Sequence, residues 1–344
     1  MTLSSLVNDV FSGTTSSPVL GILGSLPLMN NNAFKLVMME NQTELILLGL
    51  SDLPDSQIPV FLLILLVYVT TLLLNLLIIF LVVSDSHLHT PMYFFLCNLS
   101  VLDIINSSIS TSHMSFDIVT GNGLISYPTC ISQVFFFTWF ISTESFVLDI
   151  MSYDRYVAIC LPLSYTTMVS IHLCVQLAFF FWLLSFVWSL LHTLFALRLA
   201  FPDPTTIPGF FCEIYQLIRL SYSDTFLNYL LIYLEIGSFG APGCFVTFLS
   251  YVYIFKTILK IKLKDGRRKA YSTCSSHLMV VFIFYGTVFS NYLQPISKDS
   301  LGGRLISLFY AVFTPLLNPI IYSLRNAELK KALQKTLIRI GSKP

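Results

Sequence analysis

The sequence predicts an all-α membrane protein, a seven-transmembrane helix bundle with a short amphipathic helix after the last span. Composition is the first observation: 55% of the 344 residues are hydrophobic and only 11% are charged, whereas soluble domains carry roughly 25% charged residues. The number of long apolar stretches is the second, and the uneven distribution of Lys and Arg is the third. The net charge of +1 gives no reason to expect a nucleic-acid partner.

Seven stretches are long and apolar enough to cross a bilayer, since a spanning helix needs roughly 20 mostly apolar residues. They cover residues 58–83, 91–114, 130–157, 171–193, 228–259, 270–293 and 302–324. The predicted organisation is an extracellular tail over 1–57, a membrane-embedded domain over 58–324 and a cytoplasmic amphipathic helix and tail over 325–344.

Basic residues predict the orientation. Of 19 Lys and Arg, seven follow the fifth stretch, six follow the seventh, and Arg155 ends the third. With seven spans these fourteen share one side, which the positive-inside rule makes the cytoplasmic side. We therefore expect a multi-pass protein of the plasma membrane, with its N-terminus outside the cell and its C-terminus in the cytoplasm.

The two ends of the chain carry separate predictions. Residues 1–37 are rich in Ser, Asn and Gly, and we expect a disordered extension. Asn41 begins an Asn-Gln-Thr glycosylation acceptor in the external tail. After the last span, Leu329, Leu333, Leu337 and Ile340 fall on one helical face, with basic residues around the rest. This pattern predicts a helix at 326–340 that lies on membrane lipid.

Cysteine positions predict one disulfide. Of seven cysteines, only Cys130 and Cys212 fall on the external side of the predicted topology. Disulfides form in that oxidising environment and not in the cytosol. The predicted bond would tie the third helix to the loop after the fourth.

Four acids lie within predicted spans, where an unpaired charge is costly. Asp103 and Glu144 are near mid-depth in neighbouring helices, and Asn318 lies at a comparable depth in the seventh. These oxygens suit an allosteric sodium ion, but protonated acids in a hydrogen-bonded polar core explain them equally well. Asp149 has no evident partner in the sequence, and Glu235 is the fourth acid.

Enzyme signatures are missing, and no enzyme is expected: the sequence contains no His-Glu-x-x-His, no Gly-x-Ser-x-Gly and no P-loop. His192 and His277 are expected to be packed polar residues and not metal ligands, and no cofactor is expected apart from the candidate sodium ion. Asp154 and Arg155, where the third span meets a polar stretch, indicate a functional site.

Five motifs occur in order along the chain. They are Leu88–Leu96 (LHTPMYFFL), Met151–Cys160 (MSYDRYVAIC), Ser250-Tyr251, Lys269–His277 (KAYSTCSSH) and Pro315–Asn326 (PLLNPIIYSLRN). Over about 41–339 the chain resembles the olfactory receptor family of rhodopsin-like G-protein-coupled receptors. The resemblance implies an odorant receptor that binds small, mostly apolar volatile molecules within its helices. It also implies activation of a stimulatory heterotrimeric G protein and a rise in cyclic AMP.

The resemblance also implies roles for individual residues. Arg155, flanked by Asp154 and Tyr156, resembles the arginine that meets the G protein, and Tyr251 and Tyr322 resemble the tyrosines that hold the open form. The implied polar core and sodium site comprise Asn75, Asp103, Glu144 and Asn318. Tyr285 resembles the toggle below the ligand. The implied pocket consists of Phe137, Thr138, Ile141, Ser142, Glu235, Phe239, Tyr285, Val288, Phe289, Tyr292, Leu308 and Ala311.

Three departures from the family pattern stand out. Pro202 and Tyr222 occupy places where family members usually carry two further cysteines, so we expect a looser loop around Cys212. Leu74 replaces the usual glycine before Asn75. Asp149 stands where small or apolar residues are typical, so it is either protonated or raises basal activity. Within this class the chain could also be a chemosensory receptor outside the olfactory epithelium. A membrane transporter or channel is the alternative from another class, but no inverted repeats or polar path support it.

At Glu235 the sequence leaves two options open: binding of an amine, or a protonated acid that donates to a carbonyl or alcohol.

Overall fold

The computed structural model describes residues 44–48, 57–120, 123–202, 205–260, 264–292 and 307–341. The expected extension over 1–37 and the glycosylation acceptor at Asn41 lie outside these residues.

The described chain is mainly helical, as predicted. Its long helices are α4 (Gln57–Ser84), α5 (Pro91–Thr120), α6 (Tyr127–Cys160), α8 (Ile171–Ala196), α10 (Phe226–Glu235), α11 (Ala241–Lys260), α12 (Lys264–Tyr292), α14 (Thr314–Arg325) and α15 (Ala327–Gly341). Two π-helices, η4 (Ile236–Gly240) and η5 (Phe309–Phe313), connect α10 to α11 and lead into α14. Short helices η2 (Ser86–Leu88), η3 (Pro162–Ser164), α7 (Tyr165–Met168) and α9 (Ile214–Leu220) lie in the connections.

Among the described residues, five helical segments are long and apolar enough to cross a membrane. They are Ile58–Ser84, Pro91–Thr111, Tyr127–Cys160, Ile171–Ala196 and Phe226–Lys260. The sixth predicted span contains a shorter apolar helix, Cys274–Ser290. Helix α6 begins three residues before its predicted start because Ser126 caps it: the Thr129 backbone N–H donates to the Ser126 hydroxyl at 3.4 Å.

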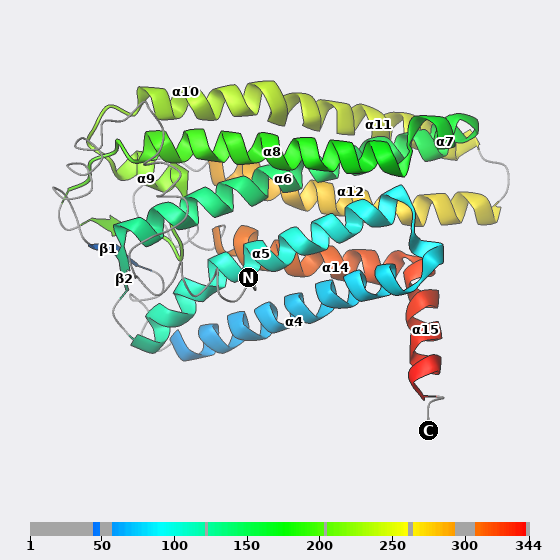
Figure 1. Cartoon of the computed structure of the whole chain (residues 1–344), viewed down its shortest axis with the longest axis horizontal. Coiled ribbons are helices and arrows are strands. Elements are labelled where there is room, and N and C mark those ends of the chain that lie inside the picture. Colours follow the sequence, from blue (N-terminus) through cyan, green and yellow to red (C-terminus); the bar gives the residue numbers. More distant parts are fainter. Residues whose placement is uncertain are drawn as a thin grey trace.

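Helix α6 is the centre of the bundle, since it packs against α5, α8, α11 and α12. Helix α4 packs between α5 and α14, and α14 also contacts α12. Figure 1 shows these helices lying side by side along the long axis of the molecule. Many residues of α4 and α10–α11 that face away from the bundle are large and apolar, as a surface against lipid requires.

A small sheet, which an all-α prediction does not include, lies at one end of the bundle. Strand β1 (Glu44–Leu47) pairs antiparallel with β2 (Leu124–Ser126) and parallel with β3 (Thr206–Ile207). Gly123 has φ +53°, and its Cβ position would lie 2.9 Å from the Leu47 carbonyl oxygen, so the close approach of β1 requires glycine there. We call this end of the molecule the sheet end (Figure 1).

Helix α15 lies at the opposite end and turns across the bundle axis (Figure 1). Leu329 is buried against the bundle, whereas Leu337 is 59% exposed. The Lys335 ammonium donates to Asp85 Oδ2 at 3.2 Å and so ties α15 to the connection between α4 and α5. The His87 backbone N–H and the Lys335 ammonium together lower the pKa of the Asp85 carboxyl below its ordinary value.

Candidate functional site

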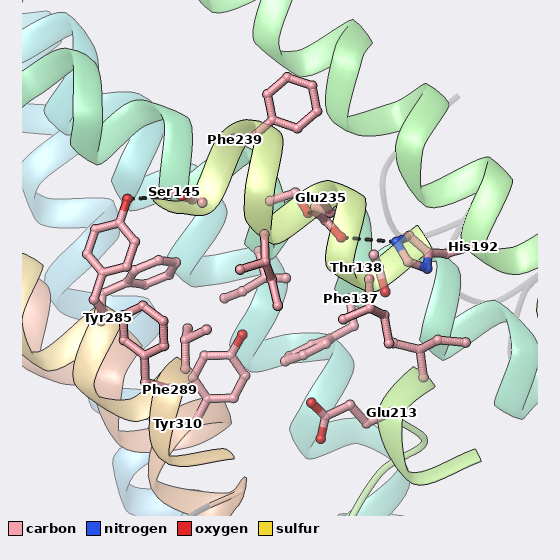
Figure 2. A pocket seen from close by; sticks show the side chains of 18 of the residues that line it. Phe137, Thr138, Ser145, His192, Glu213, Glu235, Phe239, Tyr285, Phe289 and Tyr310 are labelled. Carbon is pink, nitrogen blue, oxygen red and sulfur yellow. Dashed lines mark hydrogen bonds and ion pairs between the residues drawn. The ribbon is translucent and has the colours of Figure 1, made fainter. Parts of the chain in front are cut away.

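A cavity of about 130 Å³ lies inside the bundle, between α6, α12 and the joined segment α10–η4 (Figure 2). Nine of the implied pocket residues line it: Phe137, Thr138, Ile141, Ser142, Glu235, Phe239, Tyr285, Val288 and Phe289. The other lining residues are Ser145, Phe146, His192, Glu213, Ile214, Ile232, Ile236, Gly240, Phe284 and Tyr310. The wall is therefore mainly apolar, with a few hydroxyls, two carboxyl groups and one imidazole.

The contribution of the last span differs from the one that the resemblance implies. Leu308 and Ala311 do not line the cavity; they are buried in an apolar cluster with Phe137, and Tyr310 reaches the cavity in their place. The reason is the π-helix η5, in which each hydrogen bond spans one residue more than in an α-helix, so α-helical spacing no longer predicts the inward face. The side chain of Tyr292 lies outside the described part of the chain.

Glu235 is held at the cavity wall by two neighbouring helices. The Ser142 hydroxyl donates to Glu235 Oε1 at 2.8 Å, and His192 Nε2 lies 3.0 Å from Oε2. The His192 side chain is only 2% exposed, whereas that of Glu235 is 26% exposed. Sequence reasoning missed His192, although an ionisable side chain inside an apolar span is by itself a functional signal.

Asp149 does have partners, which corrects the expectation from the sequence. Its Oδ1 atom accepts from the Tyr285 hydroxyl at 2.9 Å and from the Thr247 hydroxyl at 3.0 Å, so it joins α6 to α12 and α11. Gly243 makes room for it, because a Cβ added there would lie 2.1 Å from Asp149 Oδ2. Tyr285 also lines the cavity, so this cluster connects the cavity wall to three helices.

Deeper in the bundle, the implied polar core is assembled. The Asn318 side-chain amide donates to Asp103 Oδ1 at 2.9 Å and to Glu144 Oε1 at 3.4 Å. Asn106, which sequence reasoning did not include, donates to Glu144 Oε2 at 3.3 Å. Asn75, on α4, has different partners: its side-chain amide donates to the backbone carbonyls of Thr71 and Pro315. Asp103, Glu144 and Asn318 are each at most 2% exposed.

The Asp103–Glu144–Asn318 cluster meets part of what a sodium ion requires. Asp103 Oδ2 and Asn318 Oδ1 have no hydrogen-bond partner among the described residues, and both are hard oxygen donors. The same atoms fit a protonated carboxyl in a polar core, and no group of three or more His, Cys, Asp or Glu that could hold a metal occurs in the described part of the chain.

Arg155 lies near the α15 end and is paired with its neighbour. Its guanidinium donates to Asp154 Oδ2, with Nε at 2.9 Å. The Tyr165 hydroxyl donates to Asp154 Oδ1 at 2.7 Å. Burial and then the Asp154 charge raise the pKa of Tyr165, so this hydroxyl stays protonated as a donor. Both oxygens of Asp154 therefore accept hydrogen bonds, and the Arg155 guanidinium is held beside Asp154.

The implied switch tyrosines surround a histidine beside Arg155. The Tyr251 hydroxyl is hydrogen-bonded to His277 Nδ1, and the centroids of the Tyr322 and His277 rings are 6.4 Å apart. Arg155, His277 and Tyr322 line one small cavity. Tyr156 packs edge-on against Tyr253 of α11 at a ring distance of 6.2 Å. The Tyr322 hydroxyl is buried without a hydrogen-bond partner among the described residues.

The sheet end holds the predicted disulfide: Cys130 and Cys212 are bonded, with their Cα atoms 5.3 Å apart. Where the family usually has two more cysteines, hydroxyls connect the two segments. Ala200 donates its N–H to the Ser223 hydroxyl at 2.9 Å, and its carbonyl accepts from the Ser221 hydroxyl at 2.9 Å and from the Tyr222 N–H at 3.1 Å. We call this set the serine clamp.

Known proteins resemble this chain over most of its length. The family described as "Olfactory receptor" matches residues 64–340. Olfactory receptor 1J2 of Homo sapiens is 47% identical over 87% of this chain and 97% of its own. Olfactory receptor 5B12 of Homo sapiens is 44% identical over 87% of this chain and 96% of its own, and olfactory receptor 8B8 of Mus musculus is 43% identical over 86% and 96%. Such receptors are multi-pass G-protein-coupled receptors with a seven-helix bundle and are not enzymes. The chain belongs to the olfactory receptor family.

Proposed function

We propose that the chain is a plasma-membrane odorant receptor whose ligand binds in the 130 Å³ cavity and which activates a stimulatory G protein, so that cyclic AMP rises. The observation that carries the proposal is the set of contacts that joins the cavity wall to three helices: Tyr285 of α12 lines the cavity and donates to Asp149 of α6, which also accepts from Thr247 of α11. A ligand that repacks Tyr285 therefore changes the contacts between α6, α11 and α12.

The described form is the resting one in this proposal. Arg155 is paired with Asp154 and is unavailable to a partner. A ligand that binds the active form more tightly shifts the equilibrium toward it. Helix α12 then moves away from Arg155, and Tyr251 and Tyr322 rearrange. The G protein contacts Arg155, α15 and the basic residues over 256–269, where α11 ends and α12 begins.

The α15 end faces the cytoplasm and the sheet end faces outward in this proposal. Support comes from the basic residues that follow α11 and α14 and from the disulfide at the sheet end, since disulfides form outside the cytosol. Exposed Leu337 and Ile338 on α15, together with its lysines, suit contact with the lipid surface.

The test replaces Arg155 by Ala and measures cyclic AMP in cells, with surface expression monitored. Basal signalling and the responses to a panel of amines, alcohols, aldehydes and acids should fall to the level of untransfected cells. Arg219→Ala is the matched control, because Arg219 stacks on Tyr215 near the sheet end and its loss should leave signalling intact. Full signalling by Arg155→Ala at normal surface density would refute the role of Arg155.

A further inference from the structure

The cavity contains one carboxylate whose surroundings indicate the chemistry of its ligand. Glu235 ends α10, directly before the π-helix η4. The wider turn brings Glu235, Ile236, Phe239 and Gly240 onto one cavity wall, while neighbouring Tyr233 and Leu234 are 68% and 49% exposed on the outer surface. π-Helical turns of this kind occur frequently at functional sites.

Both oxygens of Glu235 have a neighbour that can donate a hydrogen bond. The Ser142 hydroxyl donates to Oε1, and His192 Nε2, which donates when it carries a proton, lies 3.0 Å from Oε2. An ionised carboxylate only accepts, and it has about four lone-pair positions. Two positions are therefore occupied by protein donors, and the others are open to a ligand donor on the cavity side, where Glu235 keeps its 26% exposure.

A negative charge inside a membrane bundle is stabilised by a cationic partner. The residues that line the cavity include no Lys or Arg, so His192 is the one lining side chain that can carry a positive charge. An ammonium group donates several N–H groups and carries the opposite charge, so it forms a charge-assisted hydrogen bond, which is roughly twice as strong as a neutral one. A carboxylic acid ligand would be repelled as its anion.

The remaining cavity limits the size of the ligand. A cavity of about 150 Å³ with apolar walls holds one benzene molecule, and the cavity here is about 130 Å³. Figure 2 shows Glu235 and His192 joined on one side, with Phe289 and Tyr310 across from them. Resting on the proposed function, we propose that this receptor binds small alkyl or cycloalkyl amines, with the ammonium group on Glu235 and the hydrocarbon against the aromatic wall.

The experiment measures binding without signalling. The purified full-length receptor in lipid nanodiscs is heated with increasing hexylamine, hexanol or hexanoic acid, which differ mainly in the polar head group, and apparent affinities follow from the rise in melting temperature. An alkylamine is protonated at neutral pH, as a lysine side chain is. The wild type should bind hexylamine about tenfold or more tightly than hexanol, and hexanoic acid should produce no shift.

Two variants separate the cavity carboxylate from carboxyl groups elsewhere. Glu235→Gln keeps the shape and loses the charge, so the preference for hexylamine over hexanol should disappear. Asp224→Asn removes a carboxyl group that does not line the cavity and keeps the oxygen that accepts from the Phe226 N–H, so it should retain the preference. Equal binding of amine and alcohol by the wild type, an unchanged preference in Glu235→Gln, or a lost preference in Asp224→Asn would each overturn the assignment.

A cellular measurement distinguishes this assignment from the proposed function. If hexylamine stabilises the purified wild type but does not raise cyclic AMP in cells, the amine assignment stands and the proposed transduction fails. If hexanol or an aldehyde raises cyclic AMP through Arg155 and hexylamine neither binds nor signals, the transduction stands and the amine assignment fails.

Discussion

Replacing Asp149 by Ala should raise ligand-free signalling by a calculable amount. The carboxylate accepts two interhelical hydrogen bonds, from Tyr285 and Thr247. Interhelical hydrogen bonds in a membrane contribute about 0.6 kcal/mol each, so losing both removes about 1.2 kcal/mol from the resting form. That corresponds to about an eightfold shift of the equilibrium, since about 1.4 kcal/mol is a factor of ten. Because an unliganded receptor is active only in a small fraction, basal cyclic AMP should rise by the same factor.

A mutant cycle checks the origin of this effect. Thr247→Val removes one bond to Asp149 and should raise basal cyclic AMP about threefold. Tyr285→Phe also removes the contact between the Tyr285 and Ser145 hydroxyls at 3.3 Å, so it should raise basal cyclic AMP at least threefold. In the Asp149→Ala background Thr247→Val should add nothing further, because the acceptor is already gone. Asp149→Asn, which keeps a side-chain oxygen, should stay close to the wild type.

Gly243→Ala is an independent perturbation of the same carboxylate. The added methyl group would lie 2.1 Å from Asp149 Oδ2, so the carboxylate must move, and basal signalling should rise as in Asp149→Ala. Combined with Asp149→Ala the methyl group should be harmless. The assay is basal cyclic AMP divided by surface receptor. A fall in basal signalling on Asp149→Ala would assign these bonds to the active form and refute the reasoning.

The remaining predictions concern stability. Cys130→Ser with Cys212→Ser opens a loop with a sequence separation of 82, which costs up to about 4.5 kcal/mol in the chain-entropy model, so surface expression should be lost; unchanged expression would contradict this. Asp85→Asn should lower the melting temperature at neutral pH. The pKa of Asp85 is lowered in the fold. Its carboxylate therefore contributes its full stabilisation above the ordinary pKa of about 3.9, and this stabilisation disappears as the pH falls through the pKa of the folded state. The melting temperatures of wild type and variant should converge at that low pH. If sodium binds beside Asp103, replacing choline chloride by sodium chloride should stabilise the wild type but not Asp103→Asn; equal stabilisation of both would exclude the site.

The helices could be predicted from the sequence because each one makes its backbone hydrogen bonds within its own segment. The apolar residues of each helix can also be recognised from that segment alone. The disulfide could also be predicted, because topology left only Cys130 and Cys212 on the external side. The short strands were missed because β1 is held by residues far along the chain, near Gly123 and Ile207.

The cavity could be predicted for α6, α12 and the joined segment α10–η4, where Glu235 and Phe239 line it as expected, but not for η5. Residues of α6 and α12 fall on the expected face, whereas η5 shifts the face by its extra residue and brings in Tyr310. The partners of Asp149 were invisible for a different reason: Tyr285 and Thr247 lie 136 and 98 residues away along the chain. Side-chain direction between helices, which decides such contacts, is set by tertiary packing and not by local sequence.

The serine clamp has a consequence for biosynthesis. With the two further cysteines that family members usually carry, the sheet end would hold four cysteines, which can pair in three ways. A wrong pair must be broken and remade over seconds to hours. In the described part of this chain, the single bonded pair Cys130–Cys212 has only one way to form at the sheet end. The hydroxyl contacts around Ala200 need no oxidant. This receptor should therefore mature with little dependence on disulfide isomerase.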